Sequence, residues 1–208
     1  MSALFCMLRL LNRQRVRNMK KLMTLLLAVC AFNASASNVC HVKFNGQELS
    51  EKQWHNVRAV FINGWYNDLS WSLAAIAIVE SSAGEQMINN RTKDYGLMQN
   101  NIKTATARLK RWEKAGRDFG PYDLNNPEDV KTILLTDRTV SVQLAIEELE
   151  YWKKIRGKNN WREIYASYNG GFYKDKTWEA RAEKYSEKIV MTMRKLKPCK
   201  EQLLRGLY

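Results

Sequence analysis

The sequence predicts a mainly α-helical fold, because apolar residues recur at helical spacing in four separate stretches while strand signals are few. It contains no internal repeat and no low-complexity segment, and only three of its 208 residues are proline. The length that remains after an N-terminal segment is set aside suits one domain with a real hydrophobic core. We therefore expect a single mainly α domain over residues 37–208.

The N-terminal segment has the order of a secretory signal peptide. Met19-Lys20-Lys21 leads into the apolar run Leu22 to Phe32, and Ala34-Ser35-Ala36 follows. A run of 11 apolar residues is too short to span a bilayer comfortably, so a stable membrane anchor is the less favoured alternative. We expect residues 1–36 to be an N-terminal extension with a cleavable signal peptide. Cleavage near Ala36 would place the protein in the periplasm or outside the cell.

Two cysteines, Cys40 and Cys199, remain once residues 1–36 are removed. In an oxidising compartment an even pair favours one disulfide, which would join the first residues of the domain to its last helix. Two buried free thiols are the alternative.

The basic charge narrows the possible partners. Residues 37–208 contain 28 Lys or Arg and 21 Asp or Glu, a net charge of +7. Such a balance suits nucleic acid, an acidic membrane surface or an anionic polymer. Because export argues against nucleic acid, we expect no nucleic-acid partner.

In chain order, the first expected element is a strand at His41 to Phe44, before an Asn45-Gly46 turn signal. A helix follows that ends near Ser82, and Asp68 or Ser70 is the expected N-cap. The polar segment from Asp118 to Pro127 is expected to be a loop inside the domain. Helical spacing then predicts three further helices, marked by Val142, Ala145, Leu149 and Trp152, by Trp161, Ile164, Tyr165 and Tyr168, and by Trp178, Ala182, Tyr185 and Ile189.

Glu80 is the main candidate for chemistry. Leu73, Ile76, Ala77 and Glu80 are spaced i, i+3, i+4 and i+7, so the carboxylate continues the stripe that should face the core. Burial raises a carboxyl pKa, which suits a group that donates a proton near neutral pH. The alternative is a Glu at a frayed helix end, in water or beside one of the many Lys and Arg residues.

Three segments of the chain together resemble a known family. They are Glu80-Ser81, Gly96-Leu97-Met98-Gln99 and Ala166-Ser167-Tyr168-Asn169-Gly170-Gly171. In this order they resemble the catalytic domain of the soluble lytic transglycosylases, relatives of goose-type lysozyme that cleave peptidoglycan glycan strands. The resemblance covers roughly residues 70–189. It implies an α+β lysozyme-like fold, a single helical domain with a groove, and peptidoglycan as the partner.

The resemblance also implies a reaction. Glu80 would be the catalytic acid that protonates the bridging oxygen of the MurNAc-GlcNAc β-1,4 bond. The substrate's own N-acetyl group would stabilise the positive charge, and its C6 hydroxyl would then attack to give a 1,6-anhydro muropeptide. Glu80 would take the proton from that hydroxyl. No cofactor and no metal is expected.

Further residues are assigned to the groove by the same resemblance. Gln99, Tyr168 and Asn169 are the expected substrate contacts. Ser81 and Met98 are weaker candidates, with support of the helix end and a place in the wall or core as their favoured roles. Asp94 is either a second acid, as a hydrolase would need, or a carboxylate that fixes its own loop.

The sequence departs from the family pattern at Asn100, where Ile or Val is usual, and at Phe172, where Pro is frequent. The placement of Asp94 after Asn89-Asn90 resembles small members that accompany secretion or conjugation machinery, which are therefore possible partners. Other chemistries fit poorly, because there is no Gly-x-Ser-x-Gly elbow and no phosphate-binding glycine loop. Two alternatives stay open: a muramidase of the same fold that uses water, and a wall-binding protein without turnover.

Overall fold

The computed structural model of the protein describes residues 40–44, 46–172 and 175–205. The expected signal peptide lies outside these described residues. The described elements follow one another as β1 (Lys43–Phe44), β2 (Gln47–Glu48), α2 (Glu51–Asn63), η1 (Trp65–Asn67), α3 (Ser70–Ser81), β3 (Ile88–Asn89), β4 (Asp94–Tyr95), β5 (Asn100–Asn101), α4 (Ile102–Lys114), α5 (Pro127–Thr136), α6 (Arg138–Arg156), α7 (Trp161–Gly170), α8 (Lys176–Leu196), η2 (Lys197–Cys199) and α9 (Lys200–Leu204).

The mainly α prediction is confirmed, and the predicted helices correspond to α3, α6, α7 and α8. The segment from Asp118 to Pro127 is a loop as expected, with Pro127 at the first turn of α5. The expected N-terminal strand is present but short, because β1 pairs with β2 over two residues only.

The expected cap of α3 by Asp68 or Ser70 is wrong. Asp68 adopts a left-handed conformation with φ of 56° at the end of η1, and the fully buried Leu69 occupies the N-cap position without a side-chain cap. Ser70 is already helical. Gly64 lies so close that a Cβ there would be 2.7 Å from the Ser70 backbone nitrogen. Tight packing of η1 against the start of α3 therefore replaces a polar cap.

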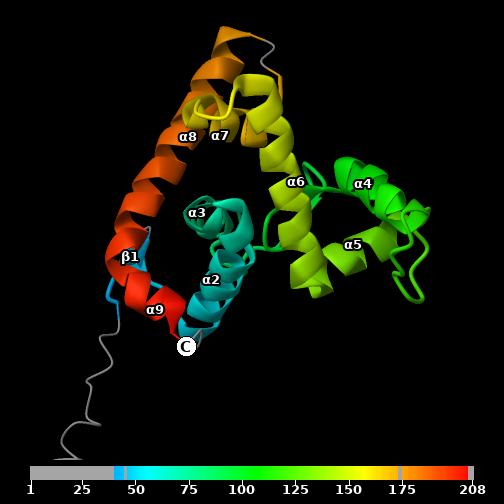
Figure 1. Ribbon diagram of the computed structural model, residues 1–208, viewed down its shortest axis with the longest axis horizontal. Helices are drawn as coiled ribbons and strands as arrows, with labels where there is room; N and C mark the ends of the chain where they lie inside the picture. Colours follow the sequence, from blue (N-terminus) through cyan, green and yellow to red (C-terminus); the bar gives the residue numbers. More distant parts are fainter. Residues whose placement is uncertain (1–39, 45, 173–174, 206–208) are drawn as a thin grey trace, which may run out of the picture. The chain divides into compact units, whose positions relative to one another are not determined.

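Helix α3 runs through the main core. It packs against α2, α6 and α8, and Figure 1 shows it between α6 and α8 with α2 beside it. This position explains its composition, because a helix with neighbours on several sides is apolar almost all round. Its fully buried residues are Leu73, Ala74, Ala75, Ile76 and Ala77.

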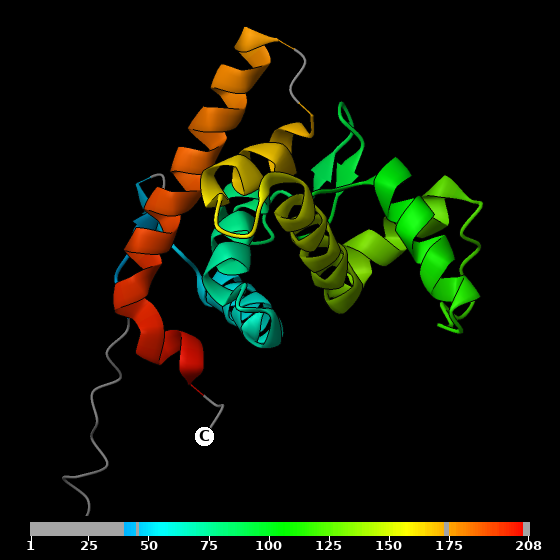
Figure 2. The same cartoon turned by 45° about the horizontal axis from the view of Figure 1, so that its top comes forward.

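The three-stranded antiparallel sheet β3-β4-β5 follows α3 along the chain and leads directly into α4. Asp94 pairs with Asn89 on one side and Asn101 on the other. Figure 2 shows this sheet beside α6 and α7. Strand β4 packs on α5 and β5 on α6, so the loops between α3 and α4 are held by helices from later in the chain.

The ends of the domain are joined by a disulfide between Cys40 and Cys199, as expected, with the two Cα atoms 5.4 Å apart. A second core cluster lies beside it and includes Phe44, Val57, Leu196 and Leu203. Among the described residues, no helix combines the length and the apolar character that crossing a membrane requires.

Candidate active site

Glu80 is the penultimate residue of α3 and lies where the helix leaves the core. The stripe of Leu73, Ile76 and Ala77 that precedes it is completely buried, whereas Glu80 itself is partly exposed. The apolar stripe therefore lies in the core, and the Glu80 carboxylate at its end lies at the surface of a cavity.

The C-terminus of α3 is fixed by a turn in which two consecutive residues other than glycine have positive φ, which is uncommon. Ser82 and Ala83 have φ values of 51° and 55°, and the Ala83 amide donates to the carbonyl of Ala77 over 2.9 Å. The buried Ser81 hydroxyl donates to the Leu97 carbonyl over 2.7 Å. This contact ties the helix end that carries Glu80 to the segment that carries Gln99.

That segment turns sharply at Gly96, where φ is +84° and a Cβ would be 2.2 Å from the Leu134 carbonyl oxygen. Only glycine fits such a position without movement of the backbone. Gln99 also has a positive φ, 49°, and its amide nitrogen donates to the Gly96 carbonyl over 3.0 Å. The turn therefore presents the Gln99 side chain in a fixed orientation at the cavity.

Two tyrosines from separate helices approach Glu80. The Tyr185 hydroxyl on α8 donates to Glu80 Oε1 over 2.5 Å, a short bond of the kind that carboxylates accept. The Tyr168 hydroxyl on α7 donates to the Met98 carbonyl over 3.0 Å. Burial and the charge of Glu80 raise the pKa of Tyr168 and of Tyr185 well above the ordinary value, so both remain donors at neutral pH.

The environment of Glu80 suits a proton donor. Its pKa is raised from 4.5 to about 7. Burial raises the pKa, the hydrogen bond from Tyr185 lowers it, the charge of Asp94 raises it and the charge of Lys188 lowers it. Burial is the largest of these effects. Glu80 therefore exchanges its proton in the range where a general acid works best.

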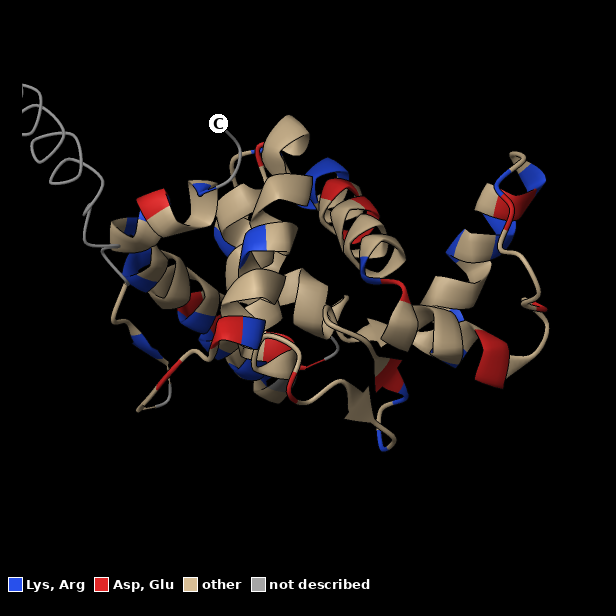
Figure 3. Ribbon diagram, turned by 90° about the horizontal axis from the view of Figure 1, so that it is seen from below, with Lys and Arg blue, Asp and Glu red and all other residues tan. Residues whose placement is uncertain are grey.

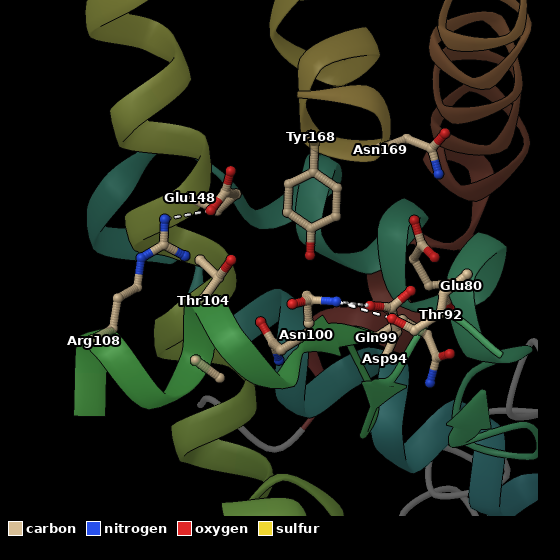
Figure 4. A pocket seen from close by; sticks show the side chains of 12 residues that line it. Glu80, Thr92, Asp94, Gln99, Asn100, Thr104, Arg108, Glu148, Tyr168 and Asn169 are labelled. Atoms are coloured by element: carbon tan, nitrogen blue, oxygen red, sulfur yellow. Dashed lines mark hydrogen bonds and ion pairs between the residues drawn. The ribbon is translucent and has the colours of Figure 1, made fainter. Parts of the chain in front are cut away.

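A first cavity of about 340 Å³ extends from Glu80 toward α4 and α6. Figure 4 shows Glu80, Asp94 and Thr92 at one end and the Arg108–Glu148 ion pair at the other, with the Tyr168 hydroxyl directed between them. Its lining is mainly polar and includes Glu80, Thr92, Asp94, Gln99, Asn100, Thr104, Arg108, Glu148, Tyr168 and Asn169.

A second cavity, of about 390 Å³, extends from the same end toward α8. The two cavities share Glu80, Thr92, Asp94, Gln99 and Asn169. They therefore form one groove that continues on both sides of Glu80.

The structure brings Glu80, Asp94, Gln99, Tyr168 and Asn169 together at this groove. Asp94 accepts a hydrogen bond from the Asn101 amide over 2.9 Å, which fits the expectation of a loop-fixing carboxylate, yet it also faces Glu80. Both roles expected of Asp94 thus remain compatible with its position.

Ser81 and Met98 lie behind the groove, and their side chains are completely buried. Ser81 holds the helix end, and Met98 packs in the main core. The expectation that Ser81 or Met98 binds substrate directly is therefore wrong, because neither side chain has any exposed surface. The supporting roles favoured from the sequence fit their positions.

Several groove residues were not predicted from the sequence. Thr92, Thr104, Arg108 and Glu148 belong to no motif, and Arg108 and Glu148 are far apart in the chain. Asn100, noted as a departure from the family pattern, donates to the carbonyl and hydroxyl oxygens of Ser141 over 3.0 Å each. Its amide therefore ties β5 to α6, which an aliphatic residue cannot do.

The described residues contain no group of three or more His, Cys, Asp or Glu side chains placed to hold a metal ion.

Comparison with known families gives a match over more than half of the chain. The family model described as "Transglycosylase SLT domain" matches residues 63–191, a segment that contains α3, the small sheet and the helices α4 to α7. Comparison with curated proteins gave no match.

Proposed function

We infer the role of Glu80 from the family match over residues 63–191. The chain belongs to the transglycosylase SLT family. The protein is a lytic transglycosylase, a lyase that cleaves glycan, and its substrate is peptidoglycan. The family match spans more than half of the chain and includes Glu80 and the segments that surround the groove.

We propose that Glu80 is the catalytic acid and base. The observation that supports this most is its position: a carboxyl group with a pKa near 7, held by Tyr185, at the point where the two cavities meet. A protonated Glu80 donates to the bridging oxygen of a MurNAc-GlcNAc β-1,4 bond as the bond to the anomeric carbon breaks. The leaving sugar then carries the proton as a free hydroxyl.

The ionised Glu80 that results acts next as a base. The N-acetyl group of the muramyl residue stabilises the positive anomeric carbon, and the C6 hydroxyl of the same residue attacks it. Glu80 accepts the hydroxyl proton as the new C1–O6 bond forms. The product is a 1,6-anhydro muropeptide, no water is consumed, and the carboxyl group returns to its protonated state.

Polar side chains of the groove are proposed to orient the strand. The Gln99 and Asn169 amides suit sugar hydroxyl and acetamido groups. The Tyr168 hydroxyl proton is engaged by the Met98 carbonyl, so its oxygen is left to accept a hydrogen bond from substrate.

Cleavage by water is the competing reading. Asp94 lines both cavities with Glu80 and could position a water molecule, as the second carboxylate of a muramidase does. Its hydrogen bond from Asn101 favours the structural role.

The test is digestion of purified peptidoglycan by the exported form, with mass spectrometry of the products. We expect 1,6-anhydro muropeptides that resist borohydride reduction as the main product. Glu80→Gln, which is nearly isosteric, should keep the fold and lose at least tenfold in rate, since general acid catalysis contributes about 10² to 10⁴-fold. Asp94→Asn should lower the rate without a change of product type.

Two outcomes would contradict the proposal. Equal rates for the wild type and Glu80→Gln would remove Glu80 from the mechanism. Reducing-end muropeptides as the main product, lost selectively in Asp94→Asn, would identify a hydrolase with Asp94 as its second acid.

Export to the periplasm or the medium after cleavage near Ala36 is also a proposal, supported by the signal-like order of residues 19–36 and by the location of peptidoglycan. A role beside secretion or conjugation machinery is a further proposal and rests on the Asn89-Asn90 and Asp94 pattern alone. Along the ribbon in Figure 3, acidic and basic residues are interspersed over the described elements.

A further inference from the structure

The two cavities beside Glu80 differ in whether their arginines form ion pairs with acidic side chains. In the first cavity Arg108 forms an ion pair with Glu148, and its Nε atom lies 3.7 Å from Glu147 Oε2. The positive charge of Arg108 is therefore compensated. The second cavity is lined by Arg91 and Arg181. Within the described residues, neither of these arginines takes part in an ion pair.

Arg91 and Arg181 reach the second cavity from two different elements. Arg91 lies in the turn between β3 and β4, and Arg181 lies on α8, so they are far apart in the sequence. Both side chains are exposed. The acidic residues of this cavity are Glu80 and Asp94, and Asp94 is already engaged by Asn101. The guanidinium groups are thus available to a ligand that enters the groove.

The chemistry of the substrate identifies what such a pair would bind. The glycan backbone itself offers hydroxyl and acetamido groups, which are neutral. The charged groups of a peptidoglycan strand lie in the stem peptides on the lactyl groups of its muramyl residues, and these peptides carry free carboxylates. A guanidinium group binds a carboxylate through two parallel, charge-assisted hydrogen bonds, which are stronger than those it makes to neutral sugar groups.

We propose that Arg91 and Arg181 bind a stem-peptide carboxylate in the second cavity, so that the enzyme prefers strands that still carry their peptides. This inference rests on the proposed function of the groove. It also gives the strand an orientation, because the neutral, hydrogen-bonding side of the groove and the unpaired cationic side lie on opposite sides of Glu80.

The test compares two forms of one substrate: linear glycan strands with their stem peptides, and the same strands after an amidase has removed the peptides and the lactyl carboxylates so exposed have been converted to neutral methyl amides. The readout is the ratio of kcat/KM on peptide-bearing strands to kcat/KM on stripped strands. For Arg91→Gln with Arg181→Gln we expect this ratio to fall about tenfold, mainly through KM, and less at high salt because exposed charges are screened. Each single variant should give an intermediate ratio.

Arg194→Gln is the matched control, since it removes the same charge from the same helix about 20 Å further along its axis. It should leave the ratio unchanged. A ratio that is also unchanged in the double variant would overturn the inference. So would an equal loss on both substrates, which would show that the arginines serve the glycan or the fold.

A binding measurement separates this inference from the proposed reaction. In a Glu80→Gln background, calorimetry with a soluble GlcNAc-MurNAc disaccharide needs no turnover; one form carries its peptide and the bare form carries a neutral methyl amide on its lactyl group. The arginine substitutions should weaken binding of the peptide-bearing form about tenfold and remove most of its advantage over the bare form. If Glu80→Gln retains activity but this advantage is lost as expected, the assignment of Glu80 fails and the carboxylate site stands.

Discussion

At Glu80, several effects act on one carboxyl group in opposite directions. Burial and the Asp94 charge favour the protonated form, whereas the Tyr185 hydroxyl and the Lys188 charge favour the ionised form. The result is a pKa of about 7, far above that of an exposed Glu. The proposed mechanism uses Glu80 as an acid in one step and as a base in the next, and a pKa of about 7 makes both forms accessible near neutral pH.

The balance predicts a pH dependence. The free enzyme must hold the Glu80 proton before it binds the strand, so kcat/KM should fall about tenfold per pH unit above pH 7. Tyr185→Phe removes a hydrogen bond that favours the ionised form, so the pKa of Glu80 should rise and the descending limb should move to higher pH. Rates on soluble glycan strands between pH 5 and about 9 measure both effects.

Tyr151→Phe is the control, because Tyr151 is an exposed tyrosine on α6 that lies outside both cavities. Its pH profile should match that of the wild type. A limb in Tyr185→Phe that stays in place or moves to lower pH would show that another group controls the decline.

The groove residues that could be predicted from the sequence are those that follow a helical periodicity or belong to a motif. Helical spacing placed Glu80 on the core-facing stripe of α3, and motifs identified Gln99, Tyr168 and Asn169, which the structure brings to the same groove. The Arg108–Glu148 pair could not be predicted, because it depends on how α4 packs against α6. The contact of Tyr185 with Glu80 depends in the same way on the crossing of α3 and α8.

At the scale of elements, the groove depends on turns rather than on helices. The end of α3, the Gly96 turn and strand β5 place Glu80, Gln99 and Asn100, and each is held by contacts to distant segments. Helix positions could be predicted because their apolar periodicity is long and regular. The N-cap of α3 could not, because close packing of η1 overrides the local preference for a polar cap.

Gly96→Ala tests the most crowded of these turns. A Cβ there would meet the Leu134 carbonyl at 2.2 Å in a backbone with φ of +84°, so we expect a loss of about 2 kcal/mol or more in the free energy of unfolding. Activity should fall as well, because movement of the turn displaces Gln99. Urea denaturation and rate measurements on the folded variant give the two quantities.

Gly116→Ala is the matched control, since Gly116 has a similar φ of +94° but nothing within 4 Å of an added Cβ. It should lose only about 1 kcal/mol from backbone strain and keep its activity. Equal losses in the two variants would show that the approach to Leu134 has no effect of its own.

Over the whole molecule, the segments that end the domain pack on the helices that start it. Cluster residues such as Phe44, Val57 and Leu203 come from β1, α2 and α9, and α2 packs in turn on α3. The same region is closed by the disulfide, which could be predicted from cysteine count and compartment alone. The packing around it could not, because it joins short elements with weak local patterns.

The disulfide gives the last prediction. Cys40 and Cys199 are separated by 159 positions, so their bond restricts the unfolded chain strongly, and loops of this length correspond to about 5 kcal/mol in the chain-entropy model. Replacing both cysteines by serine should lower the free energy of unfolding by roughly 2 to 5 kcal/mol. At temperatures below unfolding, cleavage should persist, because neither cysteine lines the groove. Denaturation of the wild type with and without reductant is the control, and it avoids the effect of serine on packing at the buried Cys199. The reduced wild type should be at least as stable as the double variant and less stable than the oxidised wild type. Equal stability of the oxidised and reduced forms would show that the bond does not hold the two ends of the domain together.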